Sequence, residues 1–219
     1  MDRKRDQRPY NALYYSTHRE QELSRVKARQ REAVEFLREL RRVPCADCRG
    51  QFPPHVMDFD HRDAERKEFW LLQRAGSVSR NRLLAELGKC DVVCANCHRA
   101  RTNARAVESR RLRSESGLVP ITESRLRREQ TALLRQLRDV PCADCQQRFP
   151  FYAMDFDHRN PTQKSFEVPR MLGRVDTERL LEEASKCDIV CANCHRIRTY
   201  EQRVATRVWR SGSVRSFQD

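Results

Sequence analysis

Long apolar stretches are missing from this sequence of 219 residues. No run approaches the roughly 20 apolar residues that a membrane-spanning helix needs, so we expect no membrane partner. The first residues, Met1 to Arg8, are polar and basic, and no apolar segment follows them, which argues against a secretory signal peptide. We therefore expect a cytoplasmic protein that is not secreted.

Apolar side chains are scarce as well. Hydrophobic residues make up 38% of the chain and aromatic residues 7%, whereas charged residues reach 34%. A single large hydrophobic core is not expected from this composition. Small units that need a further source of stability fit it better.

Acidic residues are outnumbered by basic ones. The chain has 31 Asp and Glu against 44 Lys and Arg, which gives a formal net charge of +13. Such an excess favours a polyanionic partner, because each neutralised phosphate releases a condensed counterion. Charge alone leaves DNA, RNA and an acidic membrane surface open.

The sequence contains an internal repeat. The segments VPCADC, MDFDHR and KCDVVCANCHR, which begin at residues 43, 57 and 89, return as VPCADC, MDFDHR and KCDIVCANCHR at 140, 154 and 186. The offset is 97 residues throughout, so no insertion or deletion separates the landmarks and the copies should share one fold. Two copies indicate a duplicated domain rather than a solenoid.

The repeat predicts two domains. The first, 1–116, joins an N-terminal basic helix to a unit with its core at 43–102. The second, 117–219, joins a second helix to a unit with its core at 140–199 and a basic tail. Gly117 and Pro120 mark the linker at 114–120.

Local patterns predict the elements of each copy. Capping-box spacing at Thr17–Glu20 opens a helix that we expect to end near residue 42, with Leu23, Val26, Val34, Leu37 and Leu40 on one side. Ser79 and Asp176 are expected N-caps, and Phe59, Phe69, Phe156 and Phe166 are expected core residues. The remaining predictions are extended segments at 56–60 and 91–93, a helix from 95 to about 113, and a helix at 122–138.

Ten cysteines fall into matched positions, and eight of them form Cys-x-x-Cys pairs. Two such pairs per copy can present four thiolates to one tetrahedral ion, which is the usual closed structural zinc site. Zinc would supply folding free energy, about 10–16 kcal/mol in finger peptides, to a unit too small to fold on burial alone. A disulfide framework or a redox Cys-x-x-Cys is the alternative, but no secretory or thioredoxin-like context supports it. The predicted ligands are Cys45, Cys48, Cys94 and Cys97 for the first zinc ion, and Cys142, Cys145, Cys191 and Cys194 for the second.

Cys90 and Cys187 lie outside these pairs. A free cysteine commonly packs as a small hydrophobe, and that is the favoured interpretation. An alternate zinc ligand is the other possibility.

Zinc does not account for the repeated Asp-His pair or for the histidine that follows the last cysteine. An Asp-His pair on an extended segment facing a helical histidine offers one carboxylate, one metal-binding imidazole and one further imidazole. Such a set can hold a divalent ion on a phosphate and use the other histidine as a general base. The alternative is a structural hydrogen-bonded pair in a module that only binds nucleic acid.

The order Cys-x-x-Cys, Asp-His, Cys-x-x-Cys-His-Arg resembles the zinc-containing branch of the HNH endonucleases. The resemblance covers about 43–102 and 140–199 and implies an α+β fold of two tandem ββα-metal units. It implies hydrolysis of phosphodiester bonds in DNA, with double-stranded DNA as the partner. The middle Asn of that family has no counterpart here, since its neighbourhood reads Lys89-Cys90-Asp91.

The resemblance also implies roles for individual residues. His61 and His158 would be the general bases. Mg²⁺ or Mn²⁺ would be held at each site by Asp60 with His98 and by Asp157 with His195. Backbone phosphates would be contacted by Arg62, Arg99, Arg101, Arg159, Arg196 and Arg198.

Overall fold

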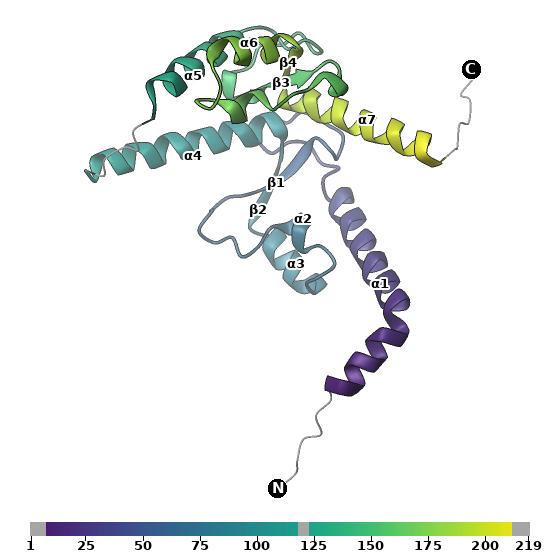
Figure 1. Cartoon of the computed structure of the whole chain (residues 1–219). Helices are drawn as coiled ribbons and strands as arrows, with labels where there is room; N and C mark the ends of the chain where they lie inside the picture. Colours follow the sequence, from purple (N-terminus) through teal and green to yellow (C-terminus); the bar gives the residue numbers. More distant parts are fainter. Residues whose placement is uncertain (1–7, 118–122, 212–219) are drawn as a thin grey trace. The chain divides into compact units, whose positions relative to one another are not determined.

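The computed structural model describes residues 8–117 and 123–211, and it is a mixed α+β structure with two small sheets (Figure 1). The predicted linker and tail therefore lie partly outside the described residues. None of the helices among the described residues combines the length and the apolar character that a membrane-spanning segment requires. The helices and strands are α1 (Arg8–Glu39), β1 (Met57–His61), α2 (Leu71–Arg74), α3 (Arg80–Leu87), β2 (Cys90–Cys94), α4 (Ala95–Glu115), α5 (Arg125–Leu137), β3 (Met154–His158), α6 (Thr177–Ser185), β4 (Cys187–Cys191) and α7 (Ala192–Ser211).

The chain divides into two compact units. The first contains residues 1–44 and 59–92, and the second contains 45–58 and 93–219. The boundaries between the compact units fall inside the first repeat, whereas the second repeat lies wholly within the second unit. The domain boundary expected near residue 116 concerns the sequence repeat and stays a prediction.

Each repeat contributes one two-stranded sheet, formed by β1 with β2 and by β3 with β4. Strands β3 and β4 are antiparallel, with Met154 opposite Cys191 and His158 opposite Cys187. Side chains alternate between the faces of a strand, so Met154 and Phe156 point to one face and Asp155 to the other. The predicted extended segments are therefore confirmed, and α7 follows β4 without a loop.

The core of the first unit forms where α1 meets α2 and α3. Leu37, Leu71, Ala75 and Leu83 are buried there, with Phe59 and Phe69 packed against them as predicted. The sequence predicted one apolar side of this helix, and burial of that whole side was wrong. Leu37 is buried, but Leu23, Val26, Val34 and Leu40 are exposed. Among the described residues, this core packs against only the stretch around Ala33–Leu37 of α1.

The start of α1 also differs from the prediction. The helix begins at Arg8, and Thr17 lies inside it, where its hydroxyl is 2.9 Å from His18 Nδ1. Pro9 is tolerated because the first-turn N–H groups of a helix have no intrahelical partner. Nothing between Pro9 and Thr17 breaks a helix, so the capping-box spacing did not set the boundary.

The second unit has its core between α5, α6 and β3–β4. Leu134, Val168 and Leu180 are buried around Phe156, and Phe166 packs beside them. Gly173 follows this core with φ +74°, and a Cβ there would lie 2.9 Å from Arg127 Cβ of α5. Glycine permits both the backbone angle and the close approach.

Both predicted N-caps are confirmed. The Ser79 hydroxyl accepts from Arg82 N at 3.4 Å, and the Asp176 carboxylate accepts from Arg179 N at 2.8 Å. These caps fix the starts of α3 and α6, the helices that each carry one buried glutamate toward the sheet.

Candidate functional site

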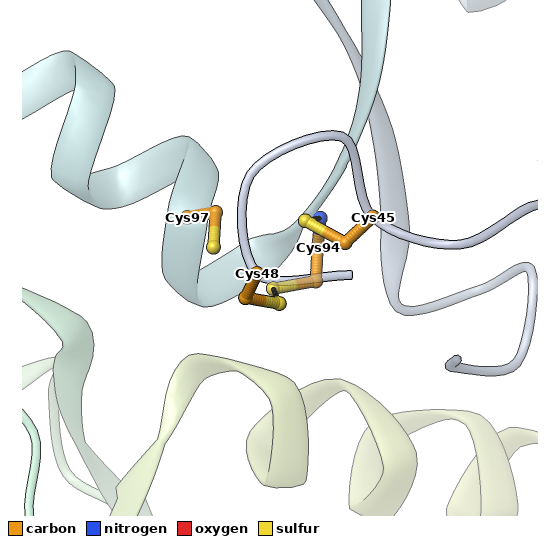
Figure 2. A group of neighbouring side chains, drawn as sticks. All are labelled: Cys45, Cys48, Cys94 and Cys97. Atoms are coloured by element: carbon orange, nitrogen blue, oxygen red, sulfur yellow. Dashed lines mark hydrogen bonds between the residues drawn. The ribbon is translucent and has the colours of Figure 1, made fainter. Parts of the chain in front are cut away.

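Two clusters of four cysteines lie within the second compact unit. In each cluster the four Sγ atoms lie within 4.8 Å of one another, and the members are those predicted from the sequence. Figure 2 shows the first cluster, with Cys45 and Cys48 on a loop, Cys94 at the end of β2 and Cys97 on α4. Cys48 Sγ and Cys94 Sγ are 4.0 Å apart. Tetrahedral zinc bonds of about 2.3 Å separate sulfur atoms by about 3.8 Å, so both clusters are compatible with structural zinc sites.

The loop of each cluster is a tight turn closed by backbone hydrogen bonds. Cys45 N donates to Gly50 O at 2.9 Å, and Arg49 N donates to Cys45 O at 2.9 Å. Arg49 and Gln146, which are repeat equivalents, both have positive φ, 61° and 58°. A left-handed conformation costs a non-glycine residue about 1–2 kcal/mol, so the turn needs an outside source of stability. A metal ion held by the four thiolates would provide it.

The thiols within a cluster differ in acidity. Burial opposes ionisation of Cys45, but backbone N–H groups, including that of Cys94 at 3.2 Å, lower its pKa to about 7. Burial and the nearby Cys94 raise the pKa of Cys97. Close thiolates repel one another unless a cation lies between them, which is the electrostatic situation that zinc resolves.

The two further cysteines stand apart from these clusters. Cys187 is buried, its Sγ lies 3.6 Å from Glu183 O, and burial raises its pKa to about 11. Cys90 makes the equivalent contact with Glu86 O at 3.5 Å. Both observations agree with packing as small neutral side chains.

An acid–histidine cluster lies beside the second cysteine cluster. His195, on the first turn of α7, has Nδ1 2.9 Å from Asp155 Oδ2 and Nε2 3.5 Å from Asp157 Oδ1. Asp157 Oδ2 accepts from Arg198 Nη1 at 3.1 Å. The helix and β3 therefore place one imidazole between two carboxylates.

His158, at the end of β3, is held by a buried glutamate. Glu183 Oε1 lies 2.9 Å from His158 Nε2 and also accepts from the backbone N–H groups of Ser165 at 2.7 Å and Phe166 at 3.2 Å. Burial alone would raise the pKa of Glu183, but these donors, together with Lys186, lower it to about 2. A carboxylate that is ionised at neutral pH can only accept, so His158 Nε2 carries a proton. In the neutral imidazole, Nδ1 is then the basic nitrogen.

The three predicted catalytic and metal-binding residues of the second repeat line one cavity of about 400 Å³. Asp157, His158 and His195 share its wall with Arg99 and Lys164. Asp155 and Glu167 line it as well, so the cavity holds three carboxylates, two imidazoles and two cationic groups. Carboxylates and imidazoles suit a divalent ion, and the cationic groups suit a phosphate.

The same contacts recur around the residues of the first repeat. His61 Nε2 lies 2.7 Å from Glu86 Oε1, and His98 Nδ1 lies 2.8 Å from Asp58 Oδ2. Asp60 is buried on β1. Asp60 and His61 belong to the first compact unit, and His98 belongs to the second.

All six arginines expected to contact phosphates make bonds within the protein. Arg62 and Arg159 donate to carbonyls at the ends of α3 and α6, including Gly88 O and Ser185 O. All six also form ion pairs: Arg62 with Asp91, Arg159 with Asp188, Arg101 with Asp47, Arg198 with Asp144, Arg99 with Asp155, and Arg196 with Asp58.

Two kinds of residue that hold the histidines were not predicted from the sequence. Glu86 and Glu183 were not singled out, although they are repeat equivalents four residues before a repeated cysteine. Asp58 and Asp155 stood inside the MDFDHR motif but were assigned no role. A full comparison of the two copies for matched ionisable residues would have found all four.

Comparisons with protein-family models, with curated proteins and with solved structures found no match to this chain. The chemistry of the site is therefore inferred from its own residues.

Proposed function

We propose that this protein is a metal-dependent endonuclease of the HNH type, built from two tandem ββα-metal units that each carry a structural zinc ion. The observation that carries the proposal is the shared cavity of Asp157, His158 and His195, with each histidine held by its own carboxylate. A module that only binds nucleic acid has no need for this arrangement.

The donor set fits a small divalent cation. Asp157 Oδ1 and His195 Nε2 are 3.5 Å apart, close enough to share one ion with ligand distances of about 2.0–2.2 Å. A bound Mg²⁺ or Mn²⁺ would polarise the phosphate and stabilise the leaving 3′ oxygen. In the first repeat, the sequence motif predicts Asp60 with His98 for the same role.

His158 acts as the general base. Glu183 holds its Nε2–H, which leaves Nδ1 to accept a proton from the attacking water. Glu183 also holds the backbone of Ser165 and Phe166, so one carboxylate fixes both the base and the loop beside it. This is the task that the middle Asn performs in the family the motifs resemble, and it explains how the chain works without that Asn. His61 and Glu86 form the same pair in the first repeat.

The substrate is nucleic acid, and double-stranded DNA is favoured. The net charge of +13 provides affinity for the phosphate backbone, and Lys164 in the cavity adds a cation that the motif did not indicate. Because the six predicted arginines are already engaged in internal bonds, phosphate contact at those positions is shared with a structural role. Affinity for duplex DNA should fall steeply as salt rises.

A plasmid nicking assay with Mg²⁺, Mn²⁺ and EDTA arms tests the proposal. Supercoiled DNA should be nicked and then linearised with metal and left intact with EDTA. If no divalent ion supports cleavage while DNA is still bound, the protein is instead a zinc-stabilised nucleic-acid-binding or regulatory module.

A further inference from the structure

Arg99 of the first repeat forms a bidentate ion pair with Asp155 of the second repeat. Arg99 Nη1 donates to Asp155 Oδ1 at 2.6 Å, and Nη2 donates to Oδ2 at 2.7 Å. The Asp155 side chain is only 16% exposed. A bidentate pair of this kind fixes the carboxylate plane as well as its charge.

Asp155 is also the carboxylate that orients His195. Its Oδ2 lies 2.9 Å from His195 Nδ1, which directs the other imidazole nitrogen toward Asp157. Metal-binding histidines commonly donate their second N–H to a carboxylate, and loss of that partner costs about 10–100-fold in metal affinity or activity. Arg99, Asp155 and His195 all line the cavity that holds His158.

The reciprocal contact exists as well. Arg196 of the second repeat donates to Asp58 Oδ2 at 2.6 Å, and Asp58 is the partner of His98. The helices that carry these arginines are joined at their first turns. Asn96 N–H donates to Asn193 Oδ1 and Asn193 N–H donates to Asn96 Oδ1, both at 3.0 Å, and both side chains are buried. The exchange satisfies helix N-terminal donors that would otherwise lack a partner.

We propose that the candidate site of the second repeat is composite: Arg99 is a positioning residue for its His195, and Arg196 is the reciprocal positioning residue for His98 of the first repeat. Each arginine acts through an aspartate on the histidine of the opposite repeat. This inference rests on the proposed function. It gives Arg99 a role at the opposite repeat in addition to the phosphate contact predicted at its own, and it makes one repeat alone an incomplete enzyme.

A crossed nicking experiment tests it. Arg99→Gln is combined with His61→Ala, which leaves the second site as the one that can cut, and separately with His158→Ala, which leaves the first. We expect Arg99→Gln to lower nicking about 10–100-fold in the His61→Ala background and much less in the His158→Ala background. Arg196→Gln should give the opposite pattern, and Arg99→Lys should lose less than Arg99→Gln because it keeps the charge.

Two controls separate positioning from folding. Arg110→Gln removes the same charge from an exposed position of α4, where the guanidinium bonds Ala106 O, and should leave nicking unchanged. Cleavage by the first site in Arg99→Gln itself shows that the chain is folded. Equal losses in both backgrounds, or a larger loss at the first site, would overturn the inference.

Mn²⁺ binding, measured by electron paramagnetic resonance on the same variants, separates this inference from the proposed function. If the wild type binds Mn²⁺ but cuts nothing, the endonuclease proposal fails. For this measurement Arg99→Gln is also combined with His98→Ala, because His61→Ala leaves both proposed metal ligands of the first repeat in place. The composite site then stands if Arg99→Gln weakens the remaining Mn²⁺ binding about 10–100-fold in the His98→Ala background, and falls if the affinity does not change. A wild type that binds no Mn²⁺ would overturn both.

Discussion

The two repeats agree closely at their ionisable residues and differ in the helices around them. The histidine–glutamate distance is 2.7 Å in the first repeat and 2.9 Å in the second, and the histidine–aspartate distance is 2.8 Å and 2.9 Å. The preceding helix, in contrast, has 32 residues in α1 and 13 in α5. The acid–histidine geometry therefore does not depend on the length of the supporting helix.

A second difference lies at the contact between that helix and the glycine turn. Gln130 of α5 is fully buried and bridges Gly173 N and Val175 O, whereas its equivalent in α1 is Ala33, which has no polar side chain. The turn is thus bonded by a glutamine side chain of the preceding helix in the second repeat, whereas the equivalent helix position in the first repeat has no polar side chain. The two repeats therefore have the same acid–histidine contacts but different packing between the preceding helix and the glycine turn.

Loss of a zinc site should have the largest effect on stability, and the effect should be similar in both repeats. Cys45→Ser and Cys142→Ser each remove one thiolate from a cluster of four, and zinc sites contribute about 10–16 kcal/mol in finger peptides. Each variant should bind one zinc ion instead of two and lose much of its thermal stability, and strong chelation should unfold the wild type. Zinc content by mass spectrometry and thermal melts by circular dichroism measure this.

Cys90→Ala and Cys187→Ala are the matched controls. Both remove a thiol that lies outside the clusters, so zinc content should stay at two and stability should change little. Freshly reduced, folded wild type without zinc would contradict the prediction.

The next largest effect should follow from loss of a proposed general base. His61→Ala or His158→Ala should lower the rate at its own site about 10²–10⁴-fold, because a positioned general base contributes about that factor. Either variant should nick supercoiled plasmid but form little linear product, and the double variant should be inert while still binding DNA. Full linearisation by a single variant would mean that the altered repeat does not cut in this chain.

The sequence predicted the parts of this structure that local chemistry determines. The cysteine clusters, the short strands and the caps at Ser79 and Asp176 followed from spacing and residue type. The N-terminal helix did not, because the apolar side chains of α1 have the right period but only the stretch near Leu37 meets a core. Periodicity shows which face of a helix could be buried, and not whether another element covers it.

The motifs named the residues that line the candidate cavity, but not the residues that hold them in place. Asp157, His158 and His195 were recognisable by motif, whereas Glu183 lies 25 residues from the histidine that it holds. Arg99 was assigned to phosphates, yet its guanidinium pairs with an aspartate 56 residues away. Such contacts depend on how the repeats fold together, which the spacing within one motif cannot reveal.

Substitution of the buried glutamates should have a smaller effect than loss of the base. Glu183→Gln keeps an oxygen for Ser165 and Phe166 but removes the negative charge that holds the His158 Nε2–H, so the ring can adopt the wrong tautomer. We expect about a 10–100-fold loss of cleavage at the second site, by analogy with other residues that orient a functional side chain. Glu86→Gln should do the same at the first site, since the two pairs match.

The exposed neighbour Glu182 provides the control, because Glu182→Gln removes the same charge without touching His158. Cleavage in the His61→Ala background isolates the second site. If Glu182→Gln and Glu183→Gln were equally active there, the glutamate would have no role in positioning the base.

The smallest effect should come from Gln130→Ala, which makes the second repeat resemble the first. Gln130 Oε1 accepts from Gly173 N at 2.7 Å and Nε2 donates to Val175 O at 2.9 Å, so the substitution leaves a buried donor and acceptor without these partners. Unsatisfied buried groups cost about 1–3 kcal/mol each at most, and water entry at the turn reduces that cost. Chemical denaturation should therefore show a loss of about 1–3 kcal/mol in unfolding free energy, with cleavage at both sites retained.

Ala33→Ser, at the equivalent position of α1, changes polarity without removing any such bond and should shift stability by less. A loss of cleavage at the second site in Gln130→Ala would show that the packing of the helix affects the acid–histidine geometry. The acid–histidine contacts of the two repeats would then not be independent of the helix that precedes them.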